Sequence, residues 1–199
     1  MTTPFAFPLD FSFKLLSLAA QFKVTDAEGK PVAAVRQKLF KLKEAISVFA
    51  DEAQTRLLYT IAADRILDFS ARYRFTGADG QELGSVKQQG MKSLWRVRFD
   101  VLDNNDQVCF HIHEESVMVR FLDHLFSQIP VLGILSGYLF HPSYIASRPS
   151  GASVMRLRKQ AALLEKKFAL ETLEPTTAAE QEQLVLSFMM TTLLERYKG

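Results

Sequence analysis

The chain has 199 residues, of which 48% are hydrophobic and 23% charged, and this composition excludes disordered and collagen-like proteins. Its 24 Lys and Arg residues nearly balance 22 Asp and Glu residues, and a net charge of +2 gives no indication of a nucleic-acid partner. A single cysteine, Cys109, excludes an intramolecular disulfide and favours a reducing, cytoplasmic location.

The first apolar stretch, Phe11 to Phe22, is as apolar as the core of a signal peptide. No basic cluster precedes it, however, and Asp10 and Lys14 introduce charge where a signal peptide has none. We therefore expect the first strands here, after a loosely held lead-in, and we do not predict export.

An internal repeat follows. Residues 25–38 and 76–89 align without a gap, and residues 149–160 form a weaker third copy. Each copy places a glycine (Gly29, Gly80 or Gly151) directly after Glu, Asp or Ser and before a run of alternating character. Because glycine tolerates a positive φ, this pattern predicts three hairpin turns.

Other runs of period two occur between the copies, at residues 45–49, 73–75, 94–99 and 108–113. Short strands with a turn about every dozen residues are typical of a barrel or a sandwich. The crossover helices of a parallel sheet are missing, so we predict an antiparallel meander.

Basic residues form same-face pairs on four predicted strands, namely Arg36 and Lys38, Arg72 and Arg74, Arg96 and Arg98, and Arg156 and Arg158. Equivalent repeat positions hold Arg36, Lys87 and Arg158. Aligned on neighbouring strands, such pairs would form a basic stripe that attracts anionic lipid. The alternative is a solvated face balanced by Asp and Glu. The predicted lipid-binding residues are Arg36, Lys38, Lys87, Arg96, Arg98, Arg156 and Arg158.

The segment Cys109 to Glu115 places a thiol, two imidazoles and a carboxylate on one face of a strand. His111, His113 and Glu115 are weak candidates for iron or zinc ligands, and a metal-dependent enzyme is therefore an alternative function. We assign no metal, because Phe110 and Ile112 direct the histidines to solvent and no orienting partners are evident.

The acidic segment Asp100 to Asp106 has oxygen ligands but lacks the glycine and the later glutamate of a calcium loop. We interpret it as a polar hairpin turn. Nucleophile elbows and glycine-rich phosphate loops do not occur in the sequence. We therefore predict no catalytic residue and no cofactor.

Two apolar segments interrupt the strand pattern. In the first, no Asp, Glu, Lys or Arg occurs from His124 to Ser147, although prolines and glycines interrupt the run. We consider a helical insertion over 121–142 that packs on the barrel or on a partner, a membrane-dipping element, or a membrane span. The predicted contact residues are Phe126, Val131, Leu132, Ile134, Leu135 and Leu139.

The second apolar segment lies near the C-terminus. Thr177 and Glu180 have the spacing of a capping box, and Leu184 to Leu194 carries no charge. A helix that is apolar on every face must be buried on every face, and this one is too short to span a bilayer. The pattern predicts a helix over 178–197 enclosed by a barrel.

The order of these features resembles the LURP-one-related family, which belongs with the tubby C-terminal domains and the phospholipid scramblases. The residues that carry the resemblance are Phe22–Gly29, Val35–Leu42, Leu83–Lys87 and the terminal helix. The resemblance implies a mainly β (α+β) fold, a tubby C-terminal-like antiparallel barrel of about twelve strands around one hydrophobic helix. Tubby domains are associated with phosphoinositide-containing membranes and scramblases with lipid movement, but their site residues do not transfer here position by position.

We therefore predict a single domain over residues 9–199, with the apolar insertion 121–142 within it and a central helix over 178–197. We expect a non-catalytic cytoplasmic module that binds an anionic membrane surface, peripherally on its inner face, or a protein partner. A dimeric scaffold assembled through the insertion is the second alternative.

Overall fold

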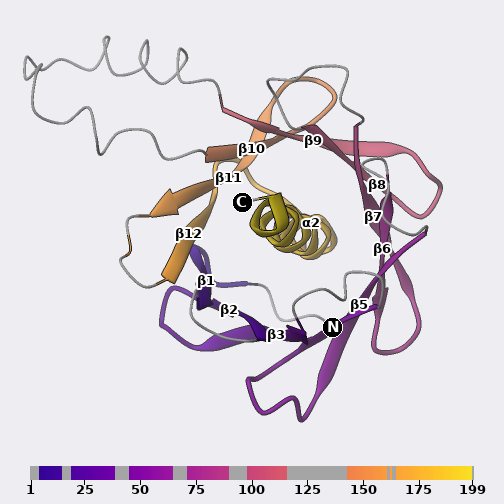
Figure 1. The fold of residues 1–199 in the computed structure, drawn as a ribbon. Coiled ribbons are helices and arrows are strands. Elements are labelled where there is room, and N and C mark those ends of the chain that lie inside the picture. Colours follow the sequence, from indigo (N-terminus) through magenta and orange to yellow (C-terminus); the bar gives the residue numbers. More distant parts are fainter. Residues whose placement is uncertain are drawn as a thin grey trace, which may run out of the picture.

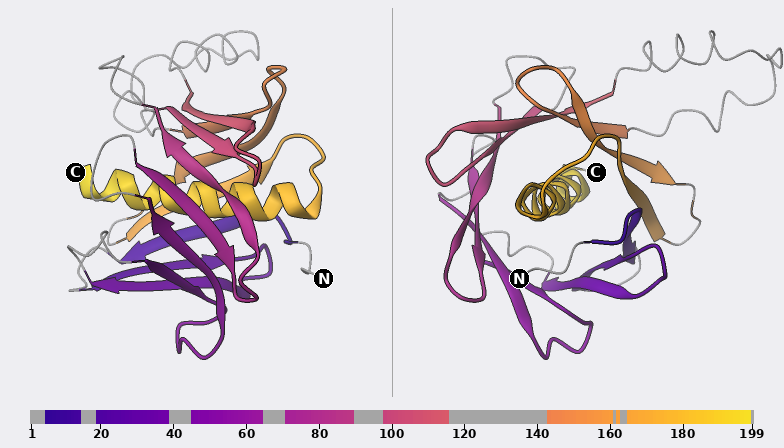
Figure 2. Two further views of the ribbon diagram at one scale, coloured as in Figure 1. Left: turned by 90° about the vertical axis from the view of Figure 1, so that its right-hand side faces the viewer. Right: turned by 180° about the vertical axis from the view of Figure 1, so that it is seen from behind.

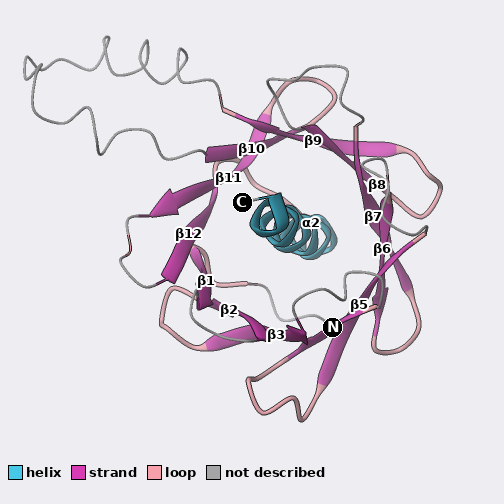
Figure 3. Ribbon diagram, in the orientation of Figure 1, coloured by secondary structure: helices cyan, strands magenta, loops and turns pink. Residues whose placement is uncertain are grey.

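The computed structural model describes residues 5–14, 19–38, 45–64, 71–89, 98–115, 143–160, 162 and 165–198. These residues form twelve strands and one helix. Figures 1 and 3 show the helix enclosed by the ring of strands. The elements are β1 (Leu9–Lys14), β2 (Ala19–Thr25), β3 (Pro31–Lys38), β4 (Ile46–Phe49), β5 (Leu57–Ala63), β6 (Arg72–Gly77), β7 (Glu82–Gln88), β8 (Arg98–Leu102), β9 (Val108–Glu114), β10 (Ser143–Ser147), β11 (Ser153–Gln160), β12 (Glu165–Thr172) and α2 (Ala178–Lys198).

Each strand pairs antiparallel with its neighbours in the sequence, and β1 pairs with β12 to close the barrel. The closing register sets Phe11 opposite Phe168 and Ser12 opposite Lys167. Closure leaves no sheet edge, which removes the liability of unpaired strand backbone. The predicted antiparallel meander is confirmed, and it is a barrel rather than a sandwich.

The core follows from the alternation of side chains along the strands. On β1, Phe11 and Phe13 point inward and are buried, whereas Asp10 and Ser12 face outward. On β9, Phe110 and Ile112 are buried and His111 is exposed, as the period of two predicts. The inner faces of the strands and the apolar residues of α2 form one hydrophobic core.

Helix α2 begins with the predicted capping box and runs lengthwise through the barrel (Figure 2). The Thr177 amide donates to Glu180 Oε2 (2.8 Å), and the Glu180 amide donates to Thr177 Oγ1 (3.3 Å). Every residue from Leu184 to Leu193 is buried. The prediction of a helix buried on all sides is therefore confirmed. Within the described residues, no helix has the length and apolarity needed to cross a membrane.

Four hairpin turns share one hydrogen-bond pattern, in which the first residue donates to the fifth and the fourth donates to the first. They span residues 26–30, 77–81, 103–107 and 148–152. The fourth position has a positive φ each time and holds glycine in the three predicted repeats, but Asp106 in the turn at 103–107. Asp103 Oδ1 accepts from the Asn105 and Gln107 amides, so the acidic segment is the polar hairpin turn that we predict.

Because the chain runs up and down, its connections alternate between two ends of the barrel. We call the strand ends joined by residues 26–30, 50–56, 77–81, 103–107 and 148–152 the hairpin end, where α2 also begins. The opposite strand ends, where α2 finishes, are called the far end. The internal residues outside the described part all belong to connections at the far end.

Polar contacts hold the start of α2 in place at the hairpin end. Tyr59 donates to Glu182 Oε1 (2.6 Å), and Arg148 donates to Glu180 Oε1 (2.5 Å). Arg148 also lies over the Phe110 ring, 5.3 Å from its centre. The hydrogen bond from Arg148 lowers the pKa of Glu180, and burial raises the pKa of Tyr59. Contacts from opposite parts of the wall thus fix where the helix enters.

Candidate functional site

The histidine face of β9 does not form the candidate metal site. His111 Nδ1 lies 2.8 Å from Asp100 Oδ1 of β8, and His113 is opposite Arg98. Glu115 is buried, and its carboxylate accepts from Ser143 Oγ (2.5 Å) and from Arg156 (3.1 Å). Among the described residues, no three His, Cys, Asp or Glu side chains are grouped to hold a metal ion. The acidic neighbour of His111 is thus Asp100, not Glu115.

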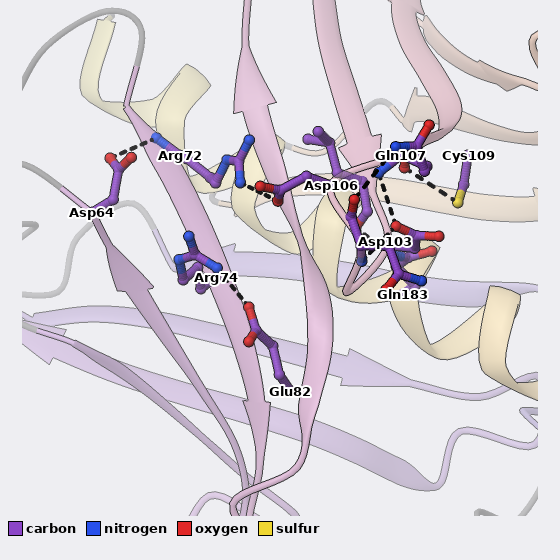
Figure 4. Close-up of polar contacts among 11 residues, drawn as sticks. Asp64, Arg72, Arg74, Glu82, Asp103, Asp106, Gln107, Cys109 and Gln183 are labelled. Atoms are coloured by element: carbon purple, nitrogen blue, oxygen red, sulfur yellow. Dashed lines mark hydrogen bonds and ion pairs between the residues drawn. The ribbon is translucent and has the colours of Figure 1, made fainter.

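Cys109 has the environment of an unreactive thiol. Its Sγ donates to the Gln107 carbonyl (3.6 Å), as Figure 4 shows. Burial, with a further contribution from Asp103, raises the pKa of the thiol. A raised pKa keeps the sulfur protonated at neutral pH and lowers its nucleophilicity.

Two of the predicted basic pairs are neutralised by carboxylates on the outer wall. Figure 4 shows Arg72 paired with Asp106 and Arg74 paired with Glu82, the second pair at 2.7 Å. On β11, Arg156 binds Glu115, and Arg158 lies 3.7 Å from Glu171. An arginine beside a carboxylate attracts an anionic ligand less strongly, because the two opposite charges largely cancel at a distance.

Lys87 and Arg98 differ from those four arginines. Both are exposed, and neither has a carboxylate partner among the described residues. Lys87 is opposite Asp100 in the register, and Arg98 is two residues before Asp100 on β8. The two cations are therefore diagonal neighbours on adjacent strands, close enough for their long side chains to reach one anionic group.

The remaining predicted residues cannot be placed. The side chains of Arg36 and Lys38 and the whole of Arg96 lie outside what the structure describes. So does the predicted helical insertion over 121–142, with Phe126, Val131, Leu132, Ile134, Leu135 and Leu139. The ends that this segment joins are described: the Glu115 amide donates to the Ser143 carbonyl (2.8 Å).

A groove of about 470 Å³ opens on the outer wall over β12, β1, β2 and β3. Its lining includes Asp10, Ser12, Lys23, Glu52 and Lys167. Lys23 binds Glu52 of the β4–β5 turn (2.8 Å), which brings that turn to the rim of the groove. Our sequence reasoning missed this groove, because the small residues that hollow it are scattered over three strands whose register the sequence does not give.

A model of the LURP-one-related family matches residues 32–171 of this chain, more than half of its length. The chain belongs to the LURP-one-related family. The resemblance predicted from the order of the repeats and the terminal helix is therefore confirmed. No curated protein and no solved structure gave a significant match.

The LURP-one-related match covers β3 to nearly the end of β12. The strands β1 and β2, which line much of the groove, and the enclosed helix α2 lie outside it. The closed barrel around one helix is consistent with a place among the tubby-like domains. The family assignment thus supports the architecture and leaves the ligand to be inferred from the surface.

Proposed function

We propose that this LURP-one-related barrel is a non-catalytic module that binds an anionic membrane surface with its far end. The main support is the position of the strand cations that no described carboxylate neutralises. They are Lys87, Arg98, Lys159 and Lys166, and each is the first or second residue of its strand counted from the far end. Arg72, the first residue of β6 from that end, is paired with Asp106, and cations farther along the strands, such as Lys23, Arg74 and Arg158, also have carboxylate partners.

The hairpin end has the opposite charge. Its turns contain more acidic than basic residues, and an anionic surface would repel them. The acidic residues are Asp26, Glu28, Asp51, Glu52, Asp79, Asp103, Asp106 and, in the connection to α2, Glu174, against Lys30, Arg56 and Arg148. Charge is therefore distributed unevenly along the barrel axis. This asymmetry favours approach to an anionic membrane with the far end first.

The sequences of the far-end connections are apolar as well as basic. Large apolar residues occur in every one of them, including Leu15, Phe40, Ile66, Trp95, Leu132 and Leu163. These residues lie outside the described part of the chain. Only their composition and the positions of the strand ends that they connect therefore support the proposal. The longest of these connections, residues 115–142, contains the 121–142 segment with the predicted contact residues.

Two weak signals at one end are sufficient for peripheral binding. Apolar insertion alone and charge alone are each marginal, but together they hold a protein on a bilayer. Each lysine or arginine near an anionic leaflet contributes about 1 kcal/mol. The cytoplasmic leaflet carries such lipids, so the inner face of a membrane is the surface that we propose.

Co-sedimentation with vesicles tests this proposal. We expect the protein to bind phosphatidylserine-containing vesicles at low salt and to bind neutral phosphatidylcholine vesicles much less. The double variant Lys87→Gln with Arg98→Gln should weaken binding roughly thirtyfold, the effect of two cations at about 1 kcal/mol each.

A matched control removes the same charge from the other end. Lys30 and Arg56 lie at the hairpin end, and no described carboxylate pairs with either. Lys30→Gln with Arg56→Gln should leave vesicle binding within about twofold of the unmodified protein. Equal losses in the two double variants, or no preference for anionic vesicles, would contradict the proposal.

The insertion is tested separately with Leu132→Ser and Ile134→Ser. We expect this variant to lose vesicle binding without a change in molar mass by light scattering. A fall from dimer to monomer with vesicle binding intact would instead support the scaffold alternative.

A further inference from the structure

The groove over β12, β1, β2 and β3 is on the side wall, across the barrel from Lys87 and Arg98 of β7 and β8. The surface is hollowed here because the outward-facing positions at the base of the groove hold small residues, Ser12, Thr25 and Ala34. Long side chains and the β4–β5 turn form the rim. A hollow of about 470 Å³ is within the range of small-molecule sites. We infer that this groove binds a phosphoethanolamine group, with the phosphate held by Lys23, Ser12 and Lys167 and the ammonium held by Asp10.

A row of residues across three strands suits the phosphate. Ser12 of β1 is opposite Lys167 of β12 on one side and opposite Lys23 of β2 on the other. All three face outward, so two ammonium groups flank one hydroxyl. Each lysine binds one carboxylate, Glu52 at 2.8 Å or Glu165 at 3.8 Å. An ammonium group has three N–H donors, so donors remain for phosphate oxygens.

A single carboxylate in the neighbouring row suits the ammonium. Asp10 is the preceding outward residue of β1, about 6.6 Å along the strand from Ser12. Its register partners are Ala169 and Thr25, which are too short to cover it. Asp10 is exposed and makes no hydrogen bond or ion pair among the described residues. The spacing of the two rows is comparable to the extent of a phosphoethanolamine group.

The charges of the lining favour a zwitterion over a simple anion. Lys23 and Lys167 are balanced by Glu52 and Glu165, and Asp10 adds one further negative charge. A bare phosphate would be attracted by the two lysines but repelled by all three carboxylates, Asp10, Glu52 and Glu165. A phosphodiester with an attached ammonium adds no net charge and gives Asp10 a partner. The groove thus discriminates by the arrangement of its charges rather than by their sum.

Titration with glycerophosphoethanolamine, followed by amide chemical shifts, tests this inference. We expect saturable shifts on β1, β2 and β12, with an affinity at least about tenfold higher than that of glycerol phosphate or ethanolamine alone. Asp10→Asn should remove the preference over glycerol phosphate without weakening glycerol phosphate itself. Lys23→Gln and Lys167→Gln should weaken both compounds. Glu28→Gln, an exposed carboxylate in the β2–β3 turn, serves as the control and should change neither.

Two results would overturn the inference. One is glycerol phosphate binding as tightly as glycerophosphoethanolamine. The other is a preference that survives Asp10→Asn. This test is independent of the proposed function. The double variant Lys87→Gln with Arg98→Gln should weaken binding to anionic vesicles but leave the glycerophosphoethanolamine titration unchanged.

The source of the group is decided with vesicles. Neutral vesicles that contain phosphatidylethanolamine should produce the same shifts if the natural ligand is a lipid headgroup. Shifts with the soluble compound alone identify a free metabolite of the same chemistry. Absence of shifts with both sources would overturn the inference.

Discussion

The two walls on either side of α2 fill the space between sheet and helix in opposite ways. Strand β7 is half-way round the barrel from β1. On the β6–β8 side the backbone of α2 lies close to the strands, and β7 has Gly84 at its inner surface. On the β1 side, large rings from β1, β2 and β12 fill the space, namely Phe11, Phe13, Phe22 and Phe168.

The helix has a matching face for the close wall. Gln183, Ser187 and Thr191 are spaced four residues apart, so they share one face of α2. Gln183 Nε2 donates to the Leu102 carbonyl of β8 (2.7 Å). The hydroxyls of Ser187 and Thr191 return hydrogen bonds to the carbonyls of Gln183 and Ser187 (2.8 and 2.9 Å). The buried polar groups on this face are thus all hydrogen-bonded. The hydroxyl side chains are also short, so the helix can lie close to the sheet.

The barrel therefore tolerates different substitutions on its two sides. The phenylalanine wall depends on volume, so a lost ring leaves a cavity. The glycine wall depends on the absence of volume, so an added methyl group produces a collision. Substitutions that reverse these two features should give the largest changes in the free energy of unfolding.

The largest effect is expected on the phenylalanine wall. Phe22 is buried, with its ring centre 4.4 Å from that of Phe13 and 5.4 Å from that of Phe11. Phe22→Ala should lower the free energy of unfolding by about 3–5 kcal/mol in urea denaturation, whereas Phe22→Leu should cost less than about 1.5 kcal/mol. Equal losses for the two variants would show that ring volume does not support this wall.

The glycine wall gives the next effect. A Cβ on Gly84 would lie 2.4 Å from the Leu102 carbonyl oxygen and 2.3 Å from Gln183 Nε2, at a φ of +108°. Gly84→Ala should therefore cost about 2–4 kcal/mol, from overpacking and backbone strain together. Gly80→Ala is the control, because it has a positive φ but an open surrounding, and should cost about 1–2 kcal/mol. Equal costs would mean that the helix does not press on β7.

The sequence predicts features that depend on local pattern. The turns at Gly29, Gly80 and Gly151, the inward positions of Phe110 and Ile112, and the capping box at Thr177 each require only nearby residues. The segment from Leu184 to Leu194 is uncharged and apolar on every face, and it is too short to span a bilayer. It therefore had to be enclosed by protein, which predicted the barrel around it.

Features that depend on strand register could not be predicted in the same way. Arg72 pairs with Asp106 and Arg156 with Glu115, contacts between segments far apart in the chain, so the basic residues cannot be sorted into paired and unpaired from their spacing. The row of Lys167, Ser12 and Lys23 likewise exists only because the first strand pairs with the last. Closing a barrel brings together residues that are far apart in the chain, and no pattern in the nearby sequence indicates which residues become neighbours.

A smaller effect is expected from the polar contact that joins the close wall to the helix. Gln183→Leu keeps the size of the side chain but leaves the Leu102 carbonyl without the amide donor, at a cost of about 1–3 kcal/mol. The double variant with Gly84→Ala should cost less than the sum of the two single variants, because the amide nitrogen is one of the two atoms with which the new methyl group collides. Strict additivity in urea denaturation would contradict this shared contact.

The smallest effect is at the hairpin end, where Arg148 and Glu180 hold the start of α2 between the two walls. The hydrogen bond from Arg148 lowers the pKa of Glu180, so the folded state favours the ionised carboxylate. Its contribution is therefore present above the ordinary carboxyl range and is lost as the pH falls through the lowered value. Glu180→Gln retains a side chain that can complete the capping box but removes the charge, and should cost about 0.5–1 kcal/mol at neutral pH. Because the pair is partly exposed, added salt should shrink this difference, and the two proteins should converge in stability once the pH is below the lowered pKa of Glu180. A difference that stays constant from neutral to acid pH would show that the helix start is held by packing and not by this charge.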